Sequence, residues 1–217
     1  MTYLISTLIF AVVGTAQLNI FEIEGIFSNA HINALEGHIE EYEYTDDDLL
    51  ILQYSSQEGS AESIAELNSL LSGYDFPIGV WFGPYKISID FKQLNNFDYI
   101  GFSPGLEINN VSFDESVEKK YCTINICNFE ERKIIVSTNE GIYDNYLIVG
   151  TLGSFIENID FVISDQSIEF FKPSLFERFY IAISNPIFTY MFFVLGFALI
   201  GLELFAIGPG LMAVVGS

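Results

Sequence analysis

The chain has 217 residues, which is enough for one domain of about 150 residues and a membrane anchor. Its 29 acidic and eight basic residues give a formal charge of -21. This balance excludes a nucleic-acid-binding protein, which needs cations to displace counterions from phosphates. The acidic residues are spread along the chain, so we interpret them as a solvated surface. The 21 Phe and 12 Tyr residues indicate a folded domain rather than a disordered one.

The first 16 residues, MTYLISTLIFAVVGTA, form an apolar run that is short for a membrane span. Small residues at Gly14 and Ala16 precede Gln17 as they do at a signal-peptidase site, although the run begins without a basic residue. We interpret this segment as a cleaved secretory signal, with a short uncleaved anchor as the alternative. In either case residues 17 to about 180 are expected outside the cytoplasm.

The first half of the chain alternates between strand and helix patterns. LNIFEIE (18–24) alternates apolar and polar residues, whereas LLILQY (49–54) and PIGVWF (77–82) are continuous apolar runs typical of buried strands. Apolar residues at helical spacing predict a helix after Ser28 and another at 61–71. This order predicts an α/β fold with a parallel sheet and right-handed crossovers. Functional groups are then expected at the carboxyl ends of the strands, at 55–59 and 83–90.

The second half gives weaker patterns. A short helix is predicted at 91–97 and a strand at 99–102, whereas the polar segment 107–120 is interpreted as a loop. Strand-like runs follow at 122–128 and 133–136, and 141–171 is expected to mix short elements.

The two cysteines, Cys122 and Cys127, lie in YCTINICNF. Their spacing is compatible with a small disulfide in an oxidising compartment, or with two buried free thiols. A zinc site is not expected, because no second Cys or His pair accompanies them.

The C-terminal stretch from Asn185 to Gly216 is strongly apolar. Residues 187–207 contain one charge, Glu203, and as a helix they would span roughly 31 Å, the thickness of a bilayer core. We therefore predict a transmembrane helix, entered at Pro186 and followed by Gly-Pro-Gly at 208–210, with Glu203 near its end in a structural role. Lys172 and Arg178 precede this span on the side expected to be extracytoplasmic, against the positive-inside tendency, so the topology stays open.

Several segments together resemble the NfeD family of membrane-bound ClpP-class serine-protease homologues. They are IEGIFSNAHINAL, FPIGVWFGP, FDYIGFSPGLEI, GIYD, TLGSFIENID and the C-terminal NP…G…E…GPG pattern, which follow the family's order over nearly the whole chain. The resemblance implies a ClpP/crotonase-like αβ domain with a parallel sheet and βα units, followed by a transmembrane helix. The expected division is a signal or anchor at 1–16, the αβ domain at 17–150, a connecting segment at 151–184 and a membrane segment at 185–217.

The residues expected to bind the oxyanion depart from the family pattern. Active members resemble one another in an Asp-Ser/Thr-Pro-Gly-Gly turn, where this chain reads SSQEG at 55–59. Only Ser56 and Gly59 match, and the resemblance makes Gly59 the candidate oxyanion residue. Glu58 would place a carboxylate where developing negative charge needs hydrogen-bond donors, which opposes catalysis.

The nucleophile position departs as well. Aligned without gaps from Pro84, the family's serine falls on Phe91, and a shift of three residues brings Ser88 there. The family uses a lysine base, for which Lys119 and Lys120 are the candidates. A base needs a depressed pKa, and we expect the acidic surroundings to raise the pKa of these lysines instead. A surface serine and two solvated lysines is therefore the preferred interpretation.

No cofactor or metal is expected. His31 and His38 lie two turns apart on one predicted helix, too far to share one ion, and we interpret them as a solvated face.

The function favoured by these patterns is a catalytically inactive binding or scaffold protein, held at the outer face of a cell membrane by one or two spans. Its expected partners are the lipid bilayer and a membrane protein or further copies of itself. The alternative is an active membrane-bound serine endopeptidase with a Ser88–Lys119 or Ser88–Lys120 dyad.

Overall fold

The structure is a computed structural model of the chain. It describes residues 17–42, 44–59, 61–89, 91–143, 146–161, 168–171, 173–184 and 186–205. The predicted signal or anchor at 1–16 and the Gly-Pro-Gly run at 208–210 lie outside these ranges.

A seven-stranded sheet organises the domain, in the order β11-β1-β2-β3-β5-β10-β9. Neighbouring strands run parallel, except that β9 pairs antiparallel with β10. This confirms the predicted α/β fold with a parallel sheet. The strands are β1 (Leu18–Phe27), β2 (Leu49–Gly59), β3 (Ile78–Phe82), β5 (Tyr99–Phe102), β9 (Gly141–Tyr143), β10 (Tyr146–Ile148) and β11 (Ile168–Phe171).

Both faces of this sheet are buried, which explains the continuous apolar runs of its strands. Successive side chains of a strand point to opposite faces. In β2, Leu49 and Ile51 pack in one hydrophobic cluster, whereas Leu50, Leu52 and Tyr54 pack in the other. All five are at most 2% exposed. The sheet is therefore the centre of a three-layer domain.

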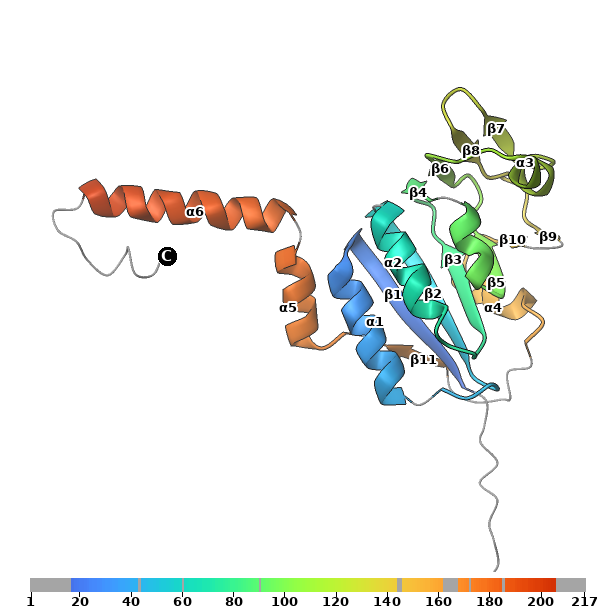
Figure 1. Cartoon of the computed structure of the whole chain (residues 1–217), viewed down its shortest axis with the longest axis horizontal. Helices are drawn as coiled ribbons and strands as arrows, with labels where there is room; N and C mark the ends of the chain where they lie inside the picture. Colours follow the sequence, from blue (N-terminus) through green and yellow to red (C-terminus); the bar gives the residue numbers. More distant parts are fainter. Residues whose placement is uncertain are drawn as a thin grey trace, which may run out of the picture.

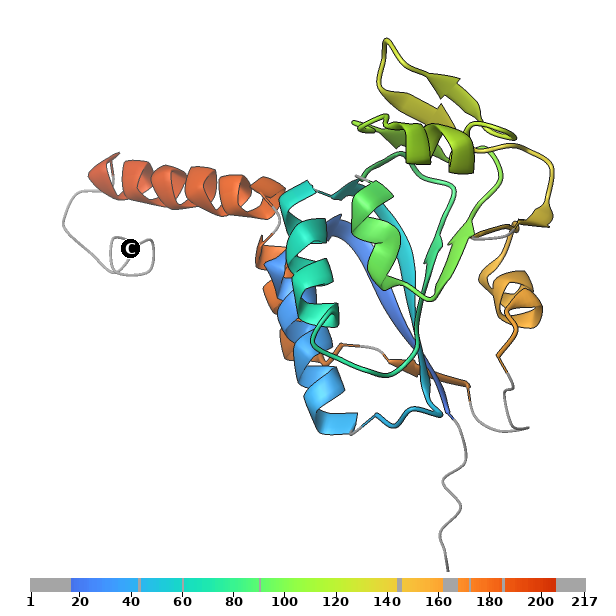
Figure 2. The ribbon, with the colours of Figure 1, turned by 45° about the vertical axis from the view of Figure 1, so that its right-hand side comes forward.

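Helices cover the two faces unequally (Figures 1 and 2). One face is covered by three helices: α1 (Asn29–Tyr42), α2 (Ala61–Leu71) and the 3-10 helix η1 (Phe91–Asn96). All three lie where the sequence predicts a helix. The opposite face is covered by α4 (Leu152–Asn158), whose Phe155 is fully buried. Thr151 caps α4 by accepting a hydrogen bond from the Ser154 N–H.

A second, four-stranded sheet stands above the carboxyl ends of the parallel strands (Figure 1). Its order is β4-β6-β8-β7, and α3 (Glu115–Tyr121) lies beside it in Figure 1. The strands are β4 (Ile87–Ser88), β6 (Glu107–Asn109), β7 (Ile126–Asn128) and β8 (Lys133–Ile135).

Three sequence-based assignments are wrong. Segment 107–120 is not a loop, because it forms β6 and α3, and 122–125 is a turn rather than part of a strand. The expected turn at 55–59 is strand: β2 continues to Gly59, which pairs with Phe27 of β1 across a β-bulge at Gly25/Ile26. Partner-strand pairing outweighs the local turn preference of this polar segment.

The C-terminal segment forms two helices, α5 (Leu175–Ser184) and α6 (Pro186–Phe205), and α6 extends away from the domain (Figure 1). Among the described residues no single helix meets the length and hydropathy expected of a membrane span. Leu175–Ile183 and Ile187–Leu202 meet them only together, as a pair bent by 75°. The predicted single transmembrane helix is therefore not supported in that form. Pro186 begins α6 because proline lacks the N–H that a first helical turn leaves unbonded.

Candidate functional site

The candidate site is built around α3, a helix with acidic residues in its first turn and basic residues in its last turn. Asp114 caps it by accepting a hydrogen bond from the Val117 N–H at 2.9 Å. Glu115 and Glu118 occupy its first turn, and Lys119 and Lys120 its last turn. Charges of these signs at these ends stabilise the helix by interacting favourably with its dipole. Both lysine side chains therefore extend from the carboxyl-terminal turn of the helix.

A disulfide holds the segment that follows α3. Cys122 bonds Cys127, with their Cα atoms 5.6 Å apart, so of the two predicted states the disulfide is the one found. Inside the closed loop, the Asn125 side chain donates to the Tyr146 hydroxyl at 3.3 Å and accepts from the Ser137 N–H at 2.9 Å. The loop is therefore fixed to β10.

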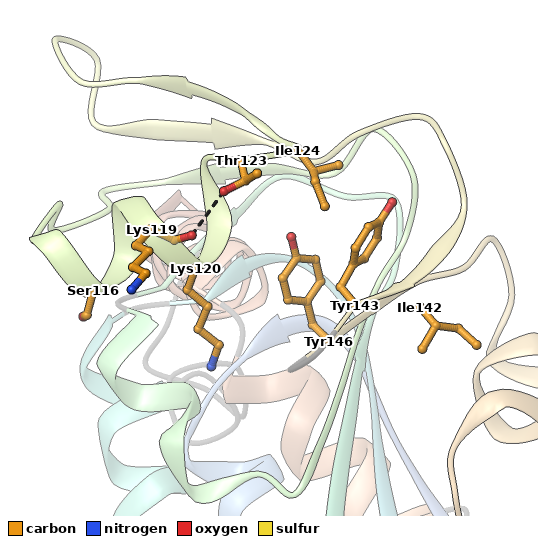
Figure 3. Close-up of a pocket in the computed structure, with 8 residues that line it drawn as sticks. All are labelled: Ser116, Lys119, Lys120, Thr123, Ile124, Ile142, Tyr143 and Tyr146. Carbon is orange, nitrogen blue, oxygen red and sulfur yellow. Dashed lines mark hydrogen bonds between the residues drawn. The ribbon is translucent and has the colours of Figure 1, made fainter.

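A cavity of about 580 Å³ lies between α3, this loop and the β9–β10 pair. Figure 3 shows two lysines on one side, two tyrosines facing them, and Thr123 and Ile124 above. Its volume is within the range typical of small-ligand sites. The described lining residues are Ser116, Lys119, Lys120, Thr123, Ile124, Ile142, Tyr143 and Tyr146.

A second cavity of about 390 Å³ shares part of this wall. Lys120, Ile142, Tyr143 and Tyr146 line both cavities. The second one also contains carboxylates, including that of Asp98, which accepts a hydrogen bond from the Ile78 N–H at 2.9 Å. The shared residues therefore stand between an acidic cavity and one that carries no carboxylate among its described lining residues.

Neither lysine of the site forms an ion pair with a carboxylate in the part of the chain that the structure describes. By contrast, Lys86 pairs with Glu107 at 3.0 Å, and Lys133 pairs with Glu131. Burial lowers the pKa of Lys120, which corrects the expectation that its acidic surroundings raise it. The Lys120 Nζ lies 5.1 Å from the centroid of the Tyr121 ring.

Ser88 lies apart from the lysine cavities. It ends β4, pairs with Asn109, and is separated from the start of η1 by two residues. It is thus close to a strand-to-helix junction. However, Ser88 is not among the described residues lining either cavity, and no hydrogen bond joins it to Lys119 or Lys120 within the described ranges.

Aromatic rings lie in one row across the central strands, at the carboxyl ends of β3 and β5 and in register with them in the middle of β2. Tyr54 of β2, Phe82 of β3 and Phe102 of β5 are each at most 2% exposed. Their centroids are 5.4 Å apart between Tyr54 and Phe82, and 5.6 Å apart between Phe82 and Phe102. Burial raises the pKa of Tyr54 to about 12, opposed by the nearby Ser56 hydroxyl. In an open parallel sheet this edge is the usual place for a ligand.

The residue that the ungapped alignment places at the nucleophile completes this packing. Phe91 begins η1, is 3% exposed, and contacts Tyr121 of α3 with ring centroids 4.2 Å apart. Tyr121 in turn stacks on Tyr146 at 5.1 Å. A hydrophobic contact therefore joins η1, α3 and β10 at the residue that the ungapped alignment aligns with the family's serine.

The candidate oxyanion segment has a structural role in this chain. The backbone of Gly59 lies in β2, and the Ser56 hydroxyl, fully buried, donates to the Gly25 carbonyl and accepts from the Phe27 N–H. Ser56 thereby joins β2 to β1 beside the β-bulge, whose extra residue is Gln57 of β2. Its contacts serve strand pairing rather than an exposed anion-binding turn.

The two histidines do not form a solvated face. His31 is 3% exposed, with its Nε2 3.1 Å from the Glu24 carbonyl oxygen and its Nδ1 3.4 Å from the Ser28 hydroxyl. His38 is partly buried against Phe171, with ring centroids 4.0 Å apart. Burial lowers the pKa of both rings. No group of three or more metal-ligating side chains occurs among the residues that are described.

Comparisons with known proteins were made in sequence and in structure. No protein-family model matches the sequence, and no curated protein matches it. In structure, the chain is similar to a lysine-to-alanine variant of the 1510-N membrane-bound stomatin-specific protease in complex with a substrate peptide. The TM-score is 0.53 at 8% identity, covering 79% of this chain and 99% of that one.

A second similar structure is a serine-to-alanine variant of the same protease. Its TM-score is 0.49 at 8% identity, covering 75% of this chain and 100% of that one. At these identities the likeness shows the fold alone. The chain therefore shares the overall α/β fold of the first of these membrane-bound protease structures, which agrees with the predicted α/β domain with a parallel sheet.

Sequence reasoning found the lysines of the cavity but not its other walls. Thr123 and Ile124 lie in a segment predicted as strand, and Ile142, Tyr143 and Tyr146 lie in a segment predicted only to mix short elements. One local signal was available: Asp114, followed by two glutamates and then two lysines, is a helix start and stop pattern. It would have placed α3 correctly. The approach of β9 and β10 to α3 has no local signal.

Proposed function

We propose that the chain is a non-catalytic binding module with a ClpP-class fold, related to the NfeD family and attached to a membrane. The observation that carries this proposal is the aromatic packing at the carboxyl ends of the central strands. A serine protease needs open space there, so that backbone donors approach the substrate carbonyl. In this chain Phe82 and Phe102 end β3 and β5, Tyr54 of β2 lies in register with them, and all three side chains are almost fully buried.

Membrane attachment is proposed from the C-terminal helices. Between Ile187 and Leu202 the described side chains of α6 are nearly all apolar, and many are large and more than 40% exposed, including Tyr190 at 71% and Phe193 at 62%. An exposed apolar surface of this extent marks an interaction with lipid or protein. The bilayer is the partner we propose for it, with a membrane protein or a second copy of the chain as further partners of the domain.

An active serine endopeptidase is the second candidate, favoured by one feature. Burial lowers the pKa of Lys120, as a general base requires. Ser88 would be the nucleophile, since it ends β4 just before η1. A hydrogen bond between the two side chains would have to form on substrate binding.

Labelling with a serine-reactive fluorophosphonate separates the two candidates. The non-catalytic module is expected to give no labelling above that of the Ser88→Ala variant. Ser56→Ala is the control variant. Because that hydroxyl is fully buried and inaccessible to the reagent, its removal is expected to leave the level of labelling unchanged. Labelling of the wild-type chain that disappears in Ser88→Ala and in Lys120→Ala would establish the protease instead.

A further inference from the structure

The cavity beside α3 is lined by positively charged side chains, although the molecule as a whole is strongly acidic. The chain carries 29 acidic residues against eight basic ones, yet the described lining of this cavity contains two lysines and no carboxylate. Among the residues that the structure describes, Lys119 and Lys120 also lack the glutamate partners that Lys86 and Lys133 have. Two cations left without carboxylate partners at one cavity favour an anionic group from outside.

The opposite wall of the cavity is aromatic and apolar. Ile124 and Ile142 are 38% and 66% exposed, which is high for isoleucine, and the rings of Tyr143 and Tyr146 lie 5.3 Å apart. A ligand with a charged end and an apolar body satisfies both walls. A bare inorganic anion would leave the isoleucines in water.

The cavity also adjoins a sheet edge. Ile142 and Tyr143 belong to β9, which is the last strand of the seven-stranded sheet in the described part of the chain. An edge strand presents backbone N–H and C=O groups on its outer side, and an extended peptide pairs with such an edge by adding a strand. This edge favours a peptide over a lipid as the apolar body.

We propose that this cavity binds the free carboxyl terminus of an extended apolar peptide. The terminal carboxylate accepts hydrogen bonds from Lys119 and Lys120, while the preceding residues lie against Ile142 and pair with the outer edge of β9. The disulfide and the Asn125–Tyr146 hydrogen bond hold the rim in place. This inference rests on the proposed binding function, since a lysine acting as a catalytic base would be directed at a serine.

Fluorescence polarisation with the full-length protein in detergent tests the proposal. The probe is a fluorescein-labelled octapeptide of alternating valine and threonine that ends in a free leucine carboxylate. We expect binding that weakens about tenfold or more when the carboxylate is replaced by an amide, and by a similar factor in Lys120→Gln. Lys120→Arg keeps the charge and is expected to retain binding.

Lys86→Gln is the matched control, because it also removes one positive charge but lies outside the cavity. Its affinity for the probe is expected to equal that of the wild type. Equal binding of the acid and amide peptides, or equal losses in Lys86→Gln and Lys120→Gln, would overturn the proposal. Circular dichroism of each variant shows that a loss is not due to unfolding.

Two further probes test the peptide itself. A peptide with N-methyl groups on alternate amides is expected to bind more weakly, because it cannot pair with β9 along that edge. Decanoate is expected to compete poorly. Undiminished binding of the methylated peptide, or competition by decanoate at the concentration of the unlabelled peptide, would overturn the assignment to a peptide. Fluorophosphonate labelling tests the non-catalytic function, and peptide binding tests the carboxylate site. Because the two measurements are independent, failure of one proposal is distinguishable from failure of the other.

Discussion

At the scale of single residues, Gly101 shows how tightly α4 packs on the sheet. A Cβ placed on Gly101 would lie 2.5 Å from Cδ2 of Phe155 and 2.8 Å from Cδ1 of Trp81. Phe155 is fully buried and Trp81 is 6% exposed, so neither ring can move into solvent. The absence of a side chain at Gly101 is what lets α4 approach β5.

Gly101→Ala is therefore expected to destabilise the domain by about 1 to 3 kcal/mol through overpacking. Gly79→Ala on the neighbouring strand is the matched control, because its Cβ would meet Phe155 only at 3.7 Å, an ordinary contact. Urea unfolding followed by tryptophan fluorescence measures both. Similar losses for the two variants would contradict this account of the packing.

His31 gives a pH-dependent contribution with a defined sign. Burial lowers its folded-state pKa below the ordinary value of 6.5, outweighing the opposing hydrogen bonds. Below pH 6.5 the unfolded chain binds a proton that the folded chain does not, so stability falls as the pH drops towards the folded-state pKa. The slope from one such group is at most about 1.4 kcal/mol per pH unit.

His31→Gln is expected to remove this part of the pH dependence. We expect the free energy of unfolding to fall less between pH 7.5 and 5 in the variant than in the wild type, as measured by urea titration at each pH. His38→Gln provides a comparison at a less buried ring, whose pKa burial also lowers. Identical pH slopes for wild type and His31→Gln would refute the assignment.

At the scale of elements, α3 and its following loop form one unit of the site. The helix is only seven residues long, which is too short to persist by itself in water. It depends on the Asp114 cap, on Val117 and Tyr121 packed in the core, and on the disulfide at its carboxyl end. The position of both lysines follows from these three constraints.

Replacing Cys122 and Cys127 together by alanine is expected to cost about 2 kcal/mol of stability, the value for a loop of about six residues in the chain-entropy account. Urea unfolding of the oxidised protein and the variant measures this loss. Dithiothreitol should lower the stability of the wild type by a similar amount and leave the variant unchanged. An effect of dithiothreitol on the variant would show that the disulfide is not its target.

At the scale of the whole molecule, the domain and the C-terminal helices differ in what covers them. The sheet is buried on both faces within the chain, whereas α6 projects from the domain (Figure 2). The large apolar side chains of α6 between Ile187 and Leu202 are exposed. The domain is therefore complete in its packing without α6. The surface of α6 needs an apolar environment that the rest of the described chain does not supply.

Alkaline carbonate extraction of membranes tests this environment. The wild-type chain is expected to stay with the membrane pellet, and Phe192→Arg combined with Leu195→Arg is expected to release it, because each arginine costs roughly 2.5 to 3.5 kcal/mol at the centre of a span. Ile126→Arg is the matched control, since Ile126 is an exposed apolar residue of β7. Extraction of the wild type to the same extent as the double variant would contradict membrane attachment.

Most of the central sheet was predictable because its signals are local. Continuous apolar runs at 49–54 and 77–82 and helical spacing from Ile32 to Tyr42 each depend on a few neighbouring residues, and all three assignments are confirmed. The polar segment 55–59 was misread because its strand conformation depends on pairing with β1, 31 residues away at Gly25 and Ser56. The local amino-acid composition of a segment does not indicate which distant strand it pairs with.

The sequence by itself determined the alternation of strands and helices, the apolar character of the C-terminus, and the two lysines as candidate site residues. Only the tertiary structure decided what those lysines face. It places Lys120 opposite Tyr143 and Tyr146 in a cavity whose described lining does not include Ser88, and it buries the aromatic rings of β2, β3 and β5 against one another. The physical reason is that side chains far apart in sequence meet only through the order of the strands, which depends on long-range packing.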